Sequence, residues 1–247
     1  MITRTLMKRS IAVAVLASWI GQAQANTFSI TDDFSATANP NGAWSYGWLN
    51  GLGGTFTEYT APLSATAGGT IQTWHDPATY SLGSPSVWNN SSASAYITGT
   101  VDYSAGWAGF HPGRQNQMSD FRFTAQTAGT YALAFDFQGA DVVGTTSDVH
   151  VYTGGNDLFS ANIIGYGDST RKSFSSMLFL NAGQTIDIAV GYGSNGSYFY
   201  DSTAVRGTIA TVPVIAAVPE PETYAMMLAG LGLLGTVARR RKQKLAA

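Results

Sequence analysis

The most specific chemical feature of the chain is a short proline and glutamate segment near its C-terminus. Pro219, Glu220 and Pro221 place one carboxylate between two rings that fix the backbone φ angle. The residue before each proline is also biased toward an extended conformation. The segment is therefore expected to be stiff and extended, which is a form that a peptide-recognising enzyme can grip. The chemistry predicted here is done to the chain by another protein.

Tryptophan side chains form a second group of candidate functional residues. Flat rings among small polar residues suit sugars, because a pyranose has an apolar C–H face that stacks on a π surface. The candidate ligand-binding residues are Trp74, Trp107, Trp44 and Trp48. Trp74 and Trp107 stand in turn-like sequence and are the preferred candidates. Trp44 and Trp48 alternate with Tyr46 at strand spacing, which favours packing in a core.

Carboxylates and histidines show no spacing typical of a catalytic site or a metal centre. Glu58 is the only glutamate in residues 26–218, which excludes a hydrolase with paired glutamates. Most aspartates stand beside Gly, Ser or Asn, where they commonly cap turns, and the histidines lack zinc-site spacing. We predict no catalytic residue, no metal site and no cofactor. Two alternatives stay open: an aspartate-based glycan hydrolase or lyase, and structural calcium in a loop such as that around Asn156 and Asp157.

The N-terminal segment predicts export. Residues 1–25 combine basic residues, an apolar run and a small-x-small end at Ala23 and Ala25. This order is typical of a helical secretory signal peptide, which signal peptidase removes before Asn26.

The C-terminal segment predicts a helix and a basic end. Residues 224–238 are apolar all round and would rise about 22 Å as a helix, against roughly 30 Å for a hydrocarbon core. We expect this helix to span the inner membrane with help from snorkelling side chains and local thinning. The basic residues that follow it, which predict a cytoplasmic C-terminus, are Arg239, Arg240, Arg241 and Lys242.

The order of Pro-Glu-Pro, apolar helix and basic cluster, from Val218 to Lys242, resembles the PEP-CTERM sorting signal of exopolysaccharide-producing Gram-negative bacteria. The resemblance covers only about one tenth of the chain, but its motif is highly specific. It implies processing near Pro219 to Pro221 by an exosortase, a membrane-embedded cysteine protease. It also implies a transient stay in the inner membrane and a final location at the cell surface or outside the cell.

The charge of the central region differs from that of the ends. Residues 26–218 hold 5 basic and 13 acidic side chains, a net charge of −8, although the whole chain is close to neutral at −2. So few cations exclude nucleic acid as a partner. The chain has no cysteine, so disulfides and a thiol nucleophile are excluded as well.

Strand patterns dominate the central region. Residues 121–125 and 131–137 are two apolar, alternating segments around a Thr-Ala-Gly turn, and they predict a β-hairpin. Within the second segment, the residues expected on one face are Tyr131, Leu133, Phe135 and Phe137. Residues 121–210 loosely resemble the β-sandwich modules often found in secreted carbohydrate-binding proteins, a resemblance that concerns architecture and transfers no binding residue.

The sequence therefore predicts an all-β protein with an antiparallel β-sandwich or jelly-roll-like body. Its predicted parts are the signal peptide (1–25), the body (26–212), a linker with the Pro-Glu-Pro motif (213–223), a transmembrane helix (224–238) and a basic cytoplasmic tail (239–247). The expected partners are signal peptidase, an exosortase, the inner membrane and, for the body, exopolysaccharide.

Overall fold

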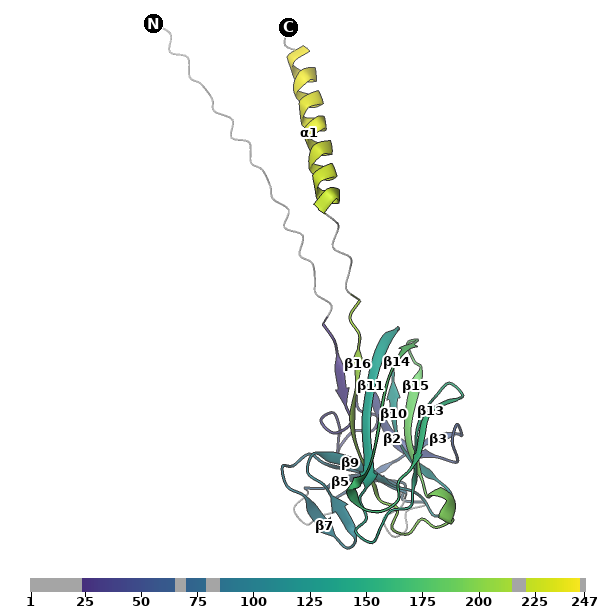
Figure 1. Ribbon diagram of the computed structural model, residues 1–247. Coiled ribbons are helices and arrows are strands. Elements are labelled where there is room, and N and C mark those ends of the chain that lie inside the picture. The colour runs from purple at the N-terminus through teal and green to yellow at the C-terminus, as the bar shows by residue number, and fades with distance from the viewer. Residues whose placement is uncertain (1–23, 65–69, 79–84, 215–220, 245–247) are drawn as a thin grey trace. The chain divides into compact units, whose positions relative to one another are not determined.

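A computed structural model describes residues 24–64, 70–78, 85–214 and 221–244 of the chain (Figure 1). Residues 25–213 form one compact unit, called the body below, and the helix α1 (Pro221–Lys244) lies outside it. The signal peptide up to Ala23 falls outside the described residues, and so do Pro219 and Glu220.

The body is an antiparallel β-sandwich, as the strand patterns predict. In the described residues its larger sheet has eight strands, of which β1 (Thr27–Ser29) pairs only with β16 (Thr203–Thr211). The other strands follow the order β14 (Gly167–Leu180), β11 (Gly129–Gly139), β16, β9 (Trp107–His111), β6 (Ser86–Asn90), β5 (Gln72–His75) and β4 (Ala61–Ser64).

The smaller sheet faces the larger one across the core. Its six strands in the described part of the body run in the order β13 (Asn156–Asn162), β12 (Asp148–Thr153), β15 (Thr185–Gly191), β10 (Met118–Thr124), β2 (Trp44–Leu49) and β3 (Phe56–Glu58). A separate hairpin joins β7 (Tyr96–Thr98) to β8 (Val101–Tyr103), and a short 3-10 helix, η1, covers Gly193–Asn195.

Aromatic side chains from both sheets fill the core. Phe121 on β10 packs edge-on against Phe110 on β9, with ring centroids 5.0 Å apart. Phe123 and Tyr131 meet in the same way at 5.7 Å. The expected inward face of β11 is confirmed, since Tyr131, Leu133, Phe135 and Phe137 are all buried. Packing of this apolar area supplies the stability that disulfides provide in other exported proteins.

The predicted hairpin between residues 121–125 and 131–137 is wrong. β10 pairs with β2 and β15 in the smaller sheet, whereas β11 pairs with β14 and β16 in the larger sheet. The chain between them crosses from one sheet to the other, so both strands can turn their aromatic faces into the same core. The chain between β14 and β15, at residues 181–184, also passes from one sheet to the other and lies beside this crossing. The amide of Ala125 donates to the carbonyl of Gln184 at 2.9 Å, and the amide of Gly183 donates to the carbonyl of Ala125 at 2.7 Å.

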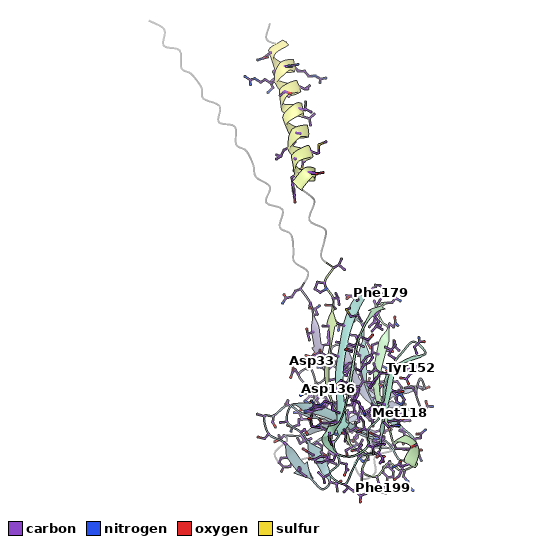
Figure 2. All side chains as sticks on the ribbon, in the orientation of Figure 1. Asp33, Met118, Asp136, Tyr152, Phe179 and Phe199 are labelled. Atoms are coloured by element: carbon purple, nitrogen blue, oxygen red, sulfur yellow. The ribbon has the colours of Figure 1, made fainter. Side chains whose placement is uncertain are left out.

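The register of the long strands defines two ends of the body. At one end, Phe179 on β14 pairs with Thr130 on β11, and the carbonyl of Thr130 accepts a hydrogen bond from Val212, close to where the chain leaves the body. Asn26 is hydrogen bonded to Thr211 at this same end. We call it the tail end. Figure 2 shows Phe179 here and Phe199 at the opposite end, which we call the distal end.

A helix forms at the predicted C-terminal position and is longer than expected. α1 begins at Pro221, where a proline fits the first helical turn, and continues through the basic cluster to Lys244. Among the described residues, no helix is both long and apolar enough to cross a membrane.

Candidate functional site

The structure describes the sorting residues only in part. Pro219 and Glu220 lie outside the described residues, and Pro221 is the first residue of α1. The basic residues Arg239, Arg240, Arg241 and Lys242 lie exposed in the last turns of the same helix.

The predicted signal cleavage site lies where the body begins. Ala23 falls outside the described residues, and Ala25 is exposed. Asn26 already belongs to the body: its amide nitrogen donates to Thr211 Oγ1 at 2.8 Å, and its carbonyl accepts from the Thr211 amide at 2.9 Å. Cleavage before Asn26 would therefore leave the first strand intact.

Trp44 and Trp74 are core residues rather than sugar platforms. Trp44 packs edge-on against Phe123 with ring centroids 5.5 Å apart. Trp74 lies in β5, not in a turn, with 5% of its surface exposed, and its Nε1 donates to the carbonyl of Ser35 at 2.7 Å. Its ring stacks on Tyr46 at 6.3 Å. Packing between the two sheets therefore covers the ring faces on which a sugar would have to stack.

Trp107 and Trp48 differ in what covers them. Trp107 lies in β9 rather than in a turn, and Arg206 sits over its ring at 4.6 Å from the centroid, with Arg171 at 5.5 Å. Only 5% of Trp107 is exposed, so its ring supports the two guanidinium groups and offers no open face to a sugar. Trp48 is half-buried and packs against the core.

A cleft of about 580 Å³ lies on the outer face of the larger sheet, over β11, β14 and β16. Asp136 is one of its lining residues and accepts hydrogen bonds from Ser173 at 2.6 Å and from Arg206 at 3.0 Å. The Ser173 hydroxyl, and then Arg206, hold the pKa of Asp136 below its usual value against a smaller opposing effect of burial. Asp136 is therefore an ionised hydrogen-bond acceptor at neutral pH, fixed by its partners.

The most closely grouped aspartates on the smaller sheet are buried. Asp120 is fully buried, and burial, followed by the charge of Asp187, raises its pKa well above the usual value. Asp187 is 4% exposed and forms a two-point ion pair with Arg122, at 2.6 and 3.0 Å. The shared location of these two strand aspartates depends on the pairing of β10 with β15. A polymer substrate cannot reach them.

His150 lies between two carboxylates on β12 and β13. Its Nε2 is 3.0 Å from Asp148 Oδ2, and its Nδ1 is 3.0 Å from Asp157 Oδ2. No group of three or more His, Cys, Asp or Glu in the described residues could hold a metal ion, and structural calcium near Asp157 stays a prediction.

Exposed aromatic residues gather instead at the distal end, where the sequence patterns did not point to a site. Tyr198, Phe199 and Tyr200 follow η1, with ring centroids 4.4 Å apart for the first pair and 6.5 Å for the second. Phe199 is 51% exposed and Tyr200 46%. The sequence did offer one signal, a run of three aromatic residues inside a loop rich in Gly and Ser. Exposing three adjacent aromatic side chains to water is unfavourable unless they pack against the protein or bind a ligand.

Comparison with known families bears on the C-terminal segment. Residues 217–242 match the family model of the PEP-CTERM protein-sorting motif. The chain carries a PEP-CTERM sorting signal. This signal spans the Pro-Glu-Pro residues, most of α1 and the basic cluster, so the interpretation of the tail from sequence is confirmed.

Solved structures that match parts of the chain include carbohydrate-binding modules and an adhesin. A family 35 module from Clostridium thermocellum is 14% identical and has a TM-score of 0.28, with coverage of 61% of this chain and 98% of that one. The CBM35 of Abf62 from Cellvibrio japonicus is 13% identical, with a TM-score of 0.28 and coverage of 49% and 80%. The K3 adhesin domain of Lys-gingipain from Porphyromonas gingivalis is 14% identical, with a TM-score of 0.27 and coverage of 44% and 75%. No curated protein matches the chain. At these values the likenesses assign no ligand to this chain.

Proposed function

We propose that this chain is an exported protein of the cell envelope or extracellular matrix, and that an exosortase processes its tail near Pro219 to Pro221. The PEP-CTERM motif at residues 217–242 carries this proposal. The separation of the chain into a body and a distinct C-terminal helix supports it, because a protease can remove α1 without disturbing the core.

The body acts by binding rather than by catalysis. Its grouped carboxylates are unsuited to hydrolysis, since Asp120 and Asp187 are buried and Asp136 is held by Ser173 and Arg206. A glycosidase needs two carboxyl groups about 5–9 Å apart that flank an accessible bond. The alternative of an aspartate-based glycan hydrolase or lyase therefore gains no support from the cleft.

Exopolysaccharide is the proposed ligand of the body. An acidic body with few cations suits a hydrated extracellular matrix and does not suit a polyanion such as nucleic acid. The exposed aromatic side chains of the distal end supply surfaces on which sugars can stack.

Processing is tested by replacing Pro219, Glu220 and Pro221 with alanine in the producing cells. We expect the wild-type protein to lose its C-terminal segment and the triple variant to keep it through Ala247, as read by mass spectrometry of the intact protein. The matched control is Pro213→Ala, which alters a proline outside the motif and should be processed normally. Identical C-termini in wild type and triple variant would refute exosortase processing at this site.

Ligand binding and catalysis are separated in a second experiment. The exported protein is purified and run through gels that contain exopolysaccharide extracted from the producing cells. Retarded migration without release of reducing ends or unsaturated sugars is the expected result. Release of either product would favour the hydrolase or lyase, and migration unaffected by the polysaccharide would leave a purely structural role.

A further inference from the structure

Four segments meet at the distal end of the body. They are residues 94–103, 140–147, 163–167 and 193–202, and we call them the distal segments. Gly139 pairs with Gly167 on one side and with Thr203 on the other, at the distal ends of β11, β14 and β16. Three of the distal segments continue from these strand ends, and the amide of Asp102 joins the fourth by donating to the carbonyl of Ala140 at 2.8 Å. The chain leaves the body at the other ends of the same strands, so the distal segments lie at the opposite end of the sandwich from that point.

Hydrogen bonds join the distal segments into one surface. The amide of Val142 donates to the carbonyl of Thr100 at 2.8 Å, and Thr145 exchanges two backbone bonds of 2.9 Å with Gly165. The Thr146 amide donates to Asp201 Oδ1 at 2.9 Å, which ties the loop of residues 193–202 to the same surface.

This surface exposes an unusual amount of apolar and aromatic area. Its exposed large hydrophobic residues are Tyr96, Ile97, Val142, Val143, Ile164, Tyr166, Phe199 and Tyr200. Soluble proteins rarely expose so many neighbouring apolar groups unless the surface binds something. A tyrosine side chain offers both an aromatic ring and a hydroxyl group. The hydroxyl of Tyr166 donates a hydrogen bond to Asp102 Oδ2 at 2.5 Å.

The residues on both sides of Phe199 and Tyr200 are anchored in the body. Tyr200 has a φ of 66°, a left-handed conformation that a bulky residue adopts only under constraint. The next residue, Asp201, is fully buried and accepts two hydrogen bonds from Thr146, at 2.9 and 2.8 Å. On the other side, Tyr198 is nearly buried and lies against His111 at 6.2 Å. A loop backbone that is fixed before binding loses little conformational entropy when a ligand arrives.

The charge of the distal segments limits the ligand. They contain Asp102, Asp141 and Asp201 and no lysine or arginine. Carboxylates, sulfates and phosphates on a ligand would meet no cation within these segments, which disfavours acidic glycans and anionic lipids. An uncharged sugar chain stacks its C–H faces on the rings and needs no cation.

We infer that the distal segments are the binding surface for an uncharged polysaccharide, with Phe199 and Tyr200 as its stacking platform. This inference rests on the proposed function, since it names the site and the ligand class of the body.

The test compares Phe199→Ala and Tyr200→Ala with Phe179→Ala, a matched control. Phe179 is 61% exposed at the tail end, so its loss removes a similar ring from the wrong place. The variants are exported proteins purified as above, and thermal melting verifies that each is folded. The probes are the uncharged and the acidic fractions of the exopolysaccharide of the producing cells, separated on an anion exchanger.

We expect the wild type and Phe179→Ala to bind the uncharged fraction with equal dissociation constants. Phe199→Ala and Tyr200→Ala should each raise the constant about tenfold or more, as for loss of a central interface ring. Phe199→Trp should retain binding, because it keeps a ring at that position.

The results that overturn the inference differ from those that overturn the proposed function. Binding of the uncharged fraction that survives both substitutions, or binding of the acidic fraction alone, places the site elsewhere and leaves polysaccharide binding intact. An equal loss in Phe179→Ala shows general adhesion and also overturns the inference. Absence of binding to both fractions refutes polysaccharide binding itself, and in that case flotation with phosphatidylcholine vesicles tests whether the rings contact lipid instead.

Discussion

Replacing His150 with glutamine should remove a pH-dependent part of the stability of the body. In the folded protein the imidazole lies 3.0 Å from Asp148 on one side and 3.0 Å from Asp157 on the other. All three side chains are at least two-thirds buried, so water screens these contacts only in part.

The expected magnitude follows from two favourable contacts and one cost. A hydrogen bond to a charged group contributes about 1.5–3 kcal/mol. Partial burial of an imidazolium and two carboxylates costs several kcal/mol, which offsets most of that gain. We therefore expect a net contribution of about 1–2 kcal/mol when His150 is charged, or about 2–8 °C in melting temperature for a body of this size.

The sign of the pH dependence follows from the two pKa shifts. Burial lowers the pKa of His150, but hydrogen bonds and charges of Asp148 and Asp157 outweigh it and raise the pKa above its usual value of 6.5. The contribution is therefore complete below 6.5 and is lost as the pH rises through the raised pKa. Burial also raises the pKa of Asp148, yet hydrogen bonds from His150 and Gly193 bring it below 3.8, so its part is present above 3.8 and lost on further acidification.

Thermal melting of wild type and His150→Gln at about pH 5.5 and about pH 8.5 provides the measurement. The gap between the two proteins should be largest at the lower pH and should shrink at the higher one. Arg206→Gln is the control: it breaks the ion pair with Asp136, and an arginine does not titrate in this range, so its effect should be equal at both values. A gap for His150→Gln that is constant with pH would show that the imidazole is not charged between its two partners.

Two further predictions concern Asp201 and Trp74. Burial raises the pKa of Asp201 to about 6, against hydrogen bonds from Thr146 that lower it. Wild-type stability should therefore fall as the pH rises from about 4 to 6. Asp201→Asn should lack this slope in urea titrations, because an amide does not titrate, and its oxygen can still accept the hydrogen bond from Thr146. An unchanged slope in the variant would assign it to other carboxylates. Trp74→Ala should lower the free energy of unfolding by about 3–5 kcal/mol, since it empties a buried site between the sheets. A variant as stable as the wild type would contradict the burial of this ring.

Local pattern was sufficient for several features of this protein. The alternation of Tyr131, Leu133, Phe135 and Phe137 indicated a strand with one buried face, because side chains in a strand point to opposite sides in turn. The sorting signal was also readable, since its proline turn, apolar run and basic cluster are contiguous in sequence. Their order does not depend on how the body folds.

Features that depend on distant partners could not be derived in this way. A Thr-Ala-Gly turn between two strands fits a hairpin and a crossing between sheets equally well, and only the pairing of β10 with β15 and of β11 with β16 decided for the crossing. Trp107 is covered by Arg206, a residue about 100 positions away in the sequence. The Gly and Ala residues next to Trp107 suggested an exposed turn, and they carry no information about this distant contact.

The candidate site illustrates the same limit. The sequence around Phe199 carries three aromatic residues in a loop, but a core strand can carry three as well. The tertiary structure buries Tyr198, leaves Phe199 and Tyr200 exposed, and brings three other segments beside them at the distal end. Exposure is a property of the whole packed chain, because each side chain is covered or left open by residues from distant strands.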